Sequence, residues 1–144
     1  LYREVILDHY RNPRNRSPLI RVDAAAEGVN PLCGDEISIS LTVEGDTVSA
    51  IAVGGHGCSI SQSSASMMSE AVRGHTLAEI ADTVRRFKQL MSIESTLELD
   101  TEHPGAVLGD LEALQGVRQY PVRIKCADLA WTTLEDALAH LPEA

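Results

Sequence analysis

The stretch NPLCGDEISISLTVEGD, residues 30–46, joins a cysteine-containing turn to the clearest strand pattern in the chain. Its apolar residues alternate with serine and threonine, at Ile37, Ile39, Leu41 and Val43. Such alternation indicates a β-strand with one buried face. The segment 44–46 that follows is a tight hairpin signal, and residues 48–53 supply a return strand. We therefore expect two or three antiparallel strands, one face of which helices must cover.

Helical patterns lie on both sides of this hairpin. Thr76 and Glu79 have the spacing of a capping box, and Pro121 suits the first turn of a final helix. Helices are expected over residues 1–10, 62–73 with Gly74 as the stop, 76–91, 108–114 closed by Gly116, and from Pro121 onward. The weakly patterned region from Ser92 to Gly109 is expected to be a loop or an inserted, mobile segment.

The composition restricts the class of protein. A chain of 144 residues predicts a single domain spanning residues 1–144. A formal net charge of −9 argues against a nucleic-acid binder, which would need a basic face. No apolar run approaches the length of a membrane span, and the first residues do not resemble a signal peptide. Because three cysteines cannot all close disulfides, a reducing cytoplasm is the predicted location.

The three cysteines each sit at the edge of a predicted element rather than within an apolar run. Cys58 and Cys126 fall near helix starts, where the helix dipole favours a thiolate. Cys33 lies in the turn, and Gly34 gives the backbone the freedom to bring Asp35 toward the same point. Three thiolates and a carboxylate make a plausible zinc site. The separations match no compact zinc finger, so unrelated buried thiols are the alternative.

Other features are interpreted as well, and two of them, His56 and a basic loop, each have two interpretations. His56 precedes Cys58 in a glycine-rich turn and is either a ligand or a turn and surface residue. The basic loop, Arg11 to Arg16, is either a solvated loop or a docking segment for an acidic partner. Met67 and Met68 are interpreted as core residues. The remaining histidines are interpreted as incidental: His9, His75, His103 and His140.

Read together, the cysteine flanks resemble the SufU branch of the IscU/NifU N-terminal family. The similar stretches are residues 2–18, 30–35, 57–61, 64–68, 123–127 and 129–131. IscU-type scaffolds carry a histidine immediately before the third cysteine, where this chain has Lys125. The SufU branch also has an insertion between the second and third cysteines, which would lie at Ser92 to Gly109. Both features favour the SufU branch over an iron–sulfur scaffold.

The resemblance implies an α+β fold, with a small antiparallel sheet of about three strands packed against helices. It implies a zinc site formed by Cys33, Asp35, Cys58 and Cys126. It also implies a zinc-dependent sulfurtransferase for iron–sulfur cluster assembly, partnered by a SufS-type, pyridoxal-phosphate-dependent cysteine desulfurase and a downstream iron–sulfur scaffold. Cys33 would leave the zinc to accept persulfide sulfur, and Arg123 matches an arginine that helps to open the site.

Two alternatives use the same cysteines. The first is a scaffold on which a [2Fe–2S] cluster is built, with Asp35 or another group as the fourth ligand. The second is a structural zinc-binding domain without transfer chemistry. Lys125, in place of a histidine, disfavours the scaffold.

Overall fold

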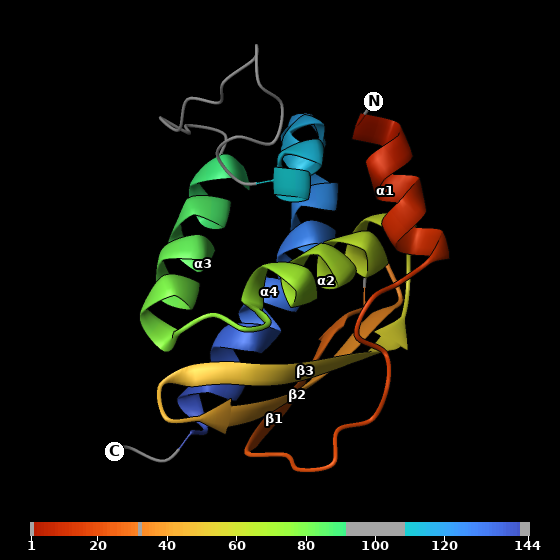
Figure 1. The fold of residues 1–144 in the computed structure, drawn as a ribbon. Coiled ribbons are helices and arrows are strands. Elements are labelled where there is room, and N and C mark those ends of the chain that lie inside the picture. The colour runs from red at the N-terminus through yellow and green to blue at the C-terminus, as the bar shows by residue number, and fades with distance from the viewer. Residues whose placement is uncertain (1, 32, 92–108, 142–144) are drawn as a thin grey trace.

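The computed structural model describes residues 2–31, 33–91 and 109–141, so the predicted loop from Ser92 to Gly109 lies outside the described residues except for Gly109. Three strands, β1 (Ala24–Asn30), β2 (Asp35–Glu44) and β3 (Thr47–His56), form an antiparallel sheet in the order β1-β2-β3. Helices cover one face of this sheet (Figure 1). The predicted α+β class and the hairpin at residues 44–46 are confirmed.

The alternating pattern of β2 places its apolar side chains under the helices. Ile37, Ile39 and Leu41 are at most 1% exposed. β1 pairs along its whole length with β2, from Ala24 opposite Leu41 to Asn30 opposite Asp35. This register brings the two ends of the cysteine-containing turn together.

The helices are α1 (Tyr2–Arg11), α2 (Ser59–Val72), α3 (Leu77–Met91), the 3-10 helix η1 (Gly109–Gln119) and α4 (Pro121–Ala139). The capping box is confirmed, because the Glu79 backbone N–H donates to Thr76 Oγ1 at 3.1 Å and the Thr76 N–H donates to Glu79 Oε1 at 2.9 Å. Pro121 begins α4 as predicted. Among the described helices, none is long and apolar enough to cross a membrane.

The expected end of the short helix at Gly116 is wrong. η1 continues through this residue to Gln119 as a 3-10 helix. A glycine that ends a helix usually does so by adopting a positive φ angle. Gly116 is not among the described glycines with a positive φ, so the helix continues.

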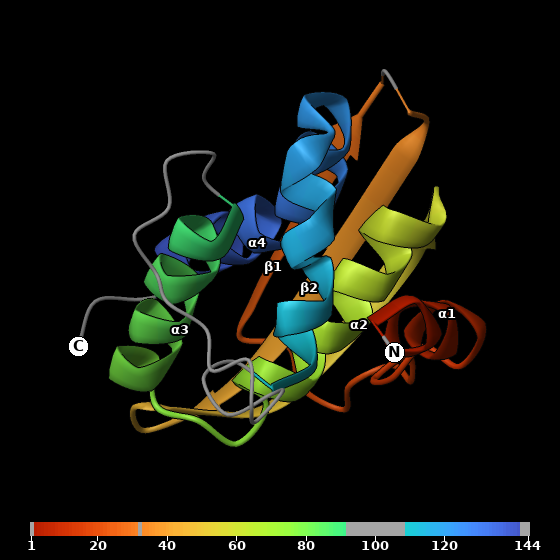
Figure 2. The same ribbon diagram turned by 90° about the horizontal axis from the view of Figure 1, so that it is seen from above.

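The central helix of the fold is α2, which lies between α1, α4 and the sheet (Figures 1 and 2). Its small side chains allow close packing, and Ser64 Oγ donates to the Ala127 carbonyl oxygen of α4 at 2.7 Å. Trp131 Nε1 donates to the same Ser64 hydroxyl at 3.2 Å. Met67 and Met68 are 2% and 0% exposed, which confirms their interpretation as core residues.

His9 is not incidental, contrary to the expectation from the sequence. Its ring is buried, with Nδ1 2.8 Å from Ser66 Oγ and Nε2 2.9 Å from Asp110 Oδ2. The histidine therefore joins α1 to both α2 and η1. Both partners are far away along the chain, so no local pattern could reveal these contacts.

Candidate metal centre

The proposed ligands come from segments that are far apart in the sequence. Cys33 lies in the turn between β1 and β2, and Asp35 is the first residue of β2. Cys58 precedes α2, and Cys126 lies in the second turn of α4. The antiparallel pairing of β2 with β3 brings the start of β2 beside the end of β3, from which the chain continues into Cys58.

The turn that carries Cys33 has the backbone geometry expected from its glycine. The Cys33 N–H donates to the Asn30 carbonyl oxygen at 3.2 Å. Gly34 has a φ of +68°, a region that favours glycine. The turn places the Asp35 side chain inward, where it is 1% exposed.

Cys58 is the N-cap residue of α2, as its predicted place at a helix start requires. The Ser61 backbone N–H donates to Cys58 Sγ at 3.5 Å. Asp35 holds the same residue from the other side, because its Oδ1 accepts the Cys58 backbone N–H at 2.8 Å. The Cys58 thiol donates to Asp35 Oδ2 at 3.8 Å. Cys58 is therefore fixed by contacts to both its backbone and its sulfur.

Cys126 is the buried thiol of the centre, with 0% exposure. It lies in the second turn of α4, near the predicted start of that helix. Its Sγ donates to Cys33 Sγ at 3.2 Å and accepts from Asn30 Nδ2 at 3.7 Å. Burial, followed by the hydrogen bond with Cys33, raises the pKa of the Cys126 thiol. A bound cation would supply the charge that favours the thiolate instead.

The donor atoms lie close enough together to hold one ion. One ligand atom each from Cys33, Asp35 and Cys126 lie within 4.8 Å of one another, and Cys58 joins the group through Asp35. A set rich in thiolate sulfur suits zinc or an iron–sulfur cluster, whereas magnesium and calcium prefer oxygen ligands. These residues therefore fit the metal that the sequence resemblance implies.

Arg123 lies on α4, one turn before Cys126. The pKa of its guanidinium is raised above the ordinary value, first by its hydrogen bond with Cys126 and then by the negative charge of Cys58. The residue thus places a positive charge beside the thiols. Its role in opening the site stays a prediction.

Two other predicted features lie at the surface. His56 is 73% exposed at its side chain and its Nε2 lies 3.2 Å from Glu36 Oε2, so its contacts fit the surface interpretation. In the basic loop, Arg14 pairs with Asp8 at 2.6 Å and Arg16 donates to the Gly55 carbonyl oxygen at 3.1 Å. These two arginines are therefore partly engaged within the chain.

Comparison with known proteins identifies relatives over nearly the whole chain. The family model described as the NifU-like N terminal domain matches residues 1–127. The zinc-dependent sulfurtransferase SufU of Bacillus subtilis (strain 168) is 41% identical, over 96% of this chain and 90% of that protein. The iron–sulfur cluster assembly scaffold protein IscU of Streptococcus pyogenes serotype M1 is 38% identical, over 100% of this chain and 86% of that protein.

Similarity to a solved structure supports the same family. A structure from Fervidobacterium islandicum AW-1, described as an iron–sulfur cluster assembly scaffold protein for the SUF system, has a TM-score of 0.81 at 32% identity and covers 94% of both chains. The match to the family model covers more than half of the chain, and the full-length relatives are well above 30% identical. This chain therefore belongs to the IscU/SufU family, which carries the NifU-like N-terminal domain.

Proposed function

We propose that this protein is a zinc-dependent sulfur acceptor and transferase that supplies sulfur for iron–sulfur cluster assembly. Its donor would be the persulfide of a pyridoxal-phosphate-dependent cysteine desulfurase, and its acceptor would be Cys33. The named activity of the Bacillus subtilis relative supports this proposal, together with the grouping of Cys33, Asp35 and Cys126 around one point.

Cys33 is proposed as the sulfur acceptor because of its position relative to the other two thiols. Cys33 is partly exposed on a turn, whereas Cys126 is fully buried. Cys58 is also partly exposed, but contacts from Ser61 and Asp35 fix it at the start of α2. Cys33 is therefore a partly exposed thiol on a turn, outside any helix, which an incoming protein can reach.

The transfer is a thiolate–disulfide type of exchange. The Cys33 thiolate attacks the outer sulfur of the desulfurase persulfide, and a new sulfur–sulfur bond forms. The bond between the two desulfurase sulfurs breaks, and the desulfurase cysteine leaves as a thiolate that takes up a proton. Cys33 then carries the persulfide, and no external oxidant or reductant is required.

The proposed zinc ligands are Cys33, Asp35, Cys58 and Cys126. When bound, zinc would keep the cysteines deprotonated at neutral pH. Asp35 orients Cys58 through the hydrogen bond to its backbone N–H. Arg123 lies one helical turn before Cys126, and its positive charge can stabilise the negative charge of an attacking or newly formed sulfur anion.

A reconstituted reaction tests the proposal. The zinc-loaded protein is incubated with a cysteine desulfurase and cysteine, and the sulfur bound to each thiol is mapped by mass spectrometry after alkylation. We expect one added sulfur atom on Cys33 and faster desulfurase turnover than without this protein. Cys33→Ser should abolish both effects. Full sulfur acceptance by Cys33→Ser, together with its loss in Cys126→Ser at intact metal content, would reassign the acceptor.

A second candidate is a scaffold for a [2Fe–2S] cluster, favoured by the 38% identity to a protein named as such a scaffold. The same sulfur-rich donor set would serve it. Metal analysis and the visible spectrum of protein purified without added metal separate the two. We expect about one zinc per chain and no colour. A brown protein with iron and acid-labile sulfide would establish the scaffold. Zinc binding without any effect on a desulfurase would indicate a structural metal.

A further inference from the structure

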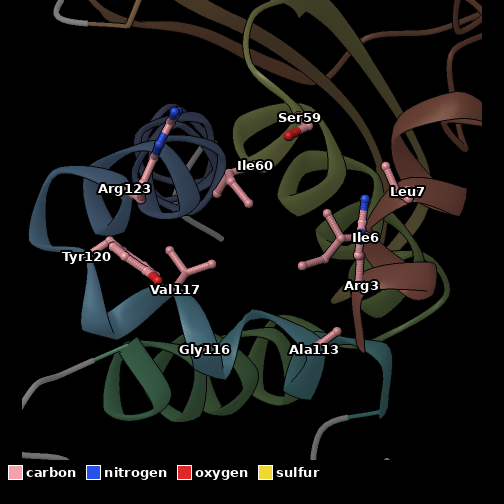
Figure 3. Close-up of a pocket in the computed structure, with 10 residues that line it drawn as sticks. All are labelled: Arg3, Ile6, Leu7, Ser59, Ile60, Ala113, Gly116, Val117, Tyr120 and Arg123. Carbon is pink, nitrogen blue, oxygen red and sulfur yellow. The ribbon is translucent and has the colours of Figure 1, made fainter. Parts of the chain in front are cut away.

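A groove with a volume of about 560 Å³ lies between α1, α2, η1 and the start of α4 (Figure 3). It was not apparent in the sequence, because its walls come from four separate segments. Most of the side chains that line it are apolar: Ile6, Leu7, Ile60, Ala113 and Val117. Arg3 on α1 lies on one side of the groove, and Tyr120 and Arg123 lie on the other (Figure 3).

Two residues that line the groove lie close along the chain to proposed metal ligands. Ser59, on its α2 wall, directly follows Cys58. Arg123, on its α4 wall, lies one helical turn before Cys126. A segment seated in the groove would therefore end beside the thiols.

Exposed apolar side chains also occur near the groove. Tyr120, which lines it, and Val122, two residues further along, are 63% and 62% exposed. Val29, near the end of β1, is 64% exposed and lies beside Lys125 of α4 in a smaller hollow. Exposed apolar side chains of this kind are typical of a surface that a partner protein covers.

The charged residues that line the groove indicate the chemistry of its occupant. Neither Arg3 nor Arg123 forms an ion pair with a residue that the structure describes. Two arginines thus line one groove in a chain with a formal net charge of −9. Carboxylates on an incoming segment would complement both arginines and guide its approach.

We propose that this groove is the docking surface for the sulfur-donor protein. The occupant is a segment of the cysteine desulfurase that carries apolar side chains flanked by carboxylates. The apolar side chains fill the groove, the carboxylates pair with Arg3 and Arg123, and the persulfide is thereby presented at the Cys33 turn. This inference rests on the function proposed above and adds the surface that recognises the donor.

Two substitutions test the groove without altering a proposed ligand. Gly116→Phe places a large side chain in the groove, and no atom lies within 4 Å of the Cβ that the substitution adds. Arg3→Glu reverses a charge on α1. The control is Arg85→Glu, the same charge reversal on α3 at a residue that does not line the groove. Melting temperature and zinc content establish that each variant is folded and loaded.

The measurement is desulfurase turnover as a function of the concentration of this protein. For Gly116→Phe and Arg3→Glu, we expect the half-saturating concentration to rise about tenfold, with maximal turnover within about twofold of the wild type. Arg85→Glu should match the wild type. If either groove variant half-saturates at the wild-type concentration while the wild-type protein stimulates the desulfurase, docking in the groove is refuted and the proposed function stands. A wild-type protein that neither binds nor stimulates the desulfurase would refute both.

A photo-crosslinking amino acid at Leu7, inside the groove, identifies the occupant. We expect crosslinks to a desulfurase peptide that contains apolar and acidic residues. Crosslinks to a second copy of this chain, to a desulfurase segment without carboxylates, or to no protein at all would each overturn the proposal.

Discussion

Asp35 Oδ1 accepts the backbone N–H of Cys58 at 2.8 Å, so the carboxylate at the start of β2 fixes the residue that caps α2. The aspartate thus has a structural contact in addition to its proposed role as a ligand. Asp35→Asn retains an oxygen acceptor and removes the charge, whereas Asp35→Ala removes both. We expect Asp35→Ala to destabilise the metal-free protein by about 1–3 kcal/mol, because the part-buried Cys58 N–H loses its partner.

Chemical denaturation of the metal-free variants measures this difference. Asp35→Asn should lie closer to the wild type than Asp35→Ala does, and both should bind zinc more weakly than the wild type. Equal stabilities for the two variants would show that the hydrogen bond contributes nothing.

Gly57 allows Asp35 to approach Cys58. A Cβ at this position would lie 2.3 Å from Asp35 Oδ1 and 2.9 Å from Asp35 Cα. We expect Gly57→Ala to displace the carboxylate, to cost about 1–3 kcal/mol of stability through overpacking, and to weaken zinc binding. Competition with a chelator measures the zinc affinity. Gly45→Ala is the control for a glycine with positive φ, since its Cβ meets no atom within 4 Å, and it should retain the wild-type affinity.

The three thiols should differ in their rates of alkylation. Cys126 is fully buried and burial raises its pKa, while Cys33 and Cys58 are partly exposed. In reduced, metal-free protein we expect Cys126 to react with iodoacetamide at least about tenfold more slowly than Cys33. Peptide mapping over time measures the rates, and the denatured protein should show no such difference. Cys126 reacting first in the folded protein would contradict the structure.

His9 should stabilise the fold through its contacts to α2 and η1. We expect His9→Ala to lower the free energy of unfolding by about 2–3 kcal/mol, because it leaves a cavity and removes two buried contacts. His75→Ala is the control, since the His75 side chain is 49% exposed, and its effect should stay within about 0.5 kcal/mol. A loss for His9→Ala no larger than for His75→Ala would show that the buried link is unimportant.

The capping box of α3 predicts a pH dependence. The hydrogen bond from the Thr76 backbone N–H lowers the pKa of Glu79 below its ordinary value. A carboxyl group whose pKa is lower in the folded state stabilises the protein above its unfolded pKa, and this stabilisation is lost as the pH falls through the folded pKa. We expect Glu79→Gln to lower the melting temperature at pH 7 and the difference to shrink in acid. A constant difference down to the lowest accessible pH would refute this linkage.

Much of the fold could be predicted because local patterns encode it. The alternation in β2, the Thr76–Glu79 capping box and Pro121 at the start of α4 each depend on neighbours a few residues apart. β1 lacked such a signal, because its alanine-rich sequence becomes a strand only by pairing with β2. η1 extends past the predicted stop at Gly116 for a similar reason, since a glycine alone does not show which backbone angle it will adopt.

The sequence by itself determined the family resemblance and the four candidate ligand residues, because these depend on the order and flanks of the cysteines. Only the tertiary structure decided that Cys33 is accessible while Cys126 is buried, that His9 links three helices, and that four segments enclose a groove with Arg3 and Arg123 on its walls. The physical reason is that accessibility and side-chain contact depend on residues that are distant in the chain and meet only when the sheet and helices pack.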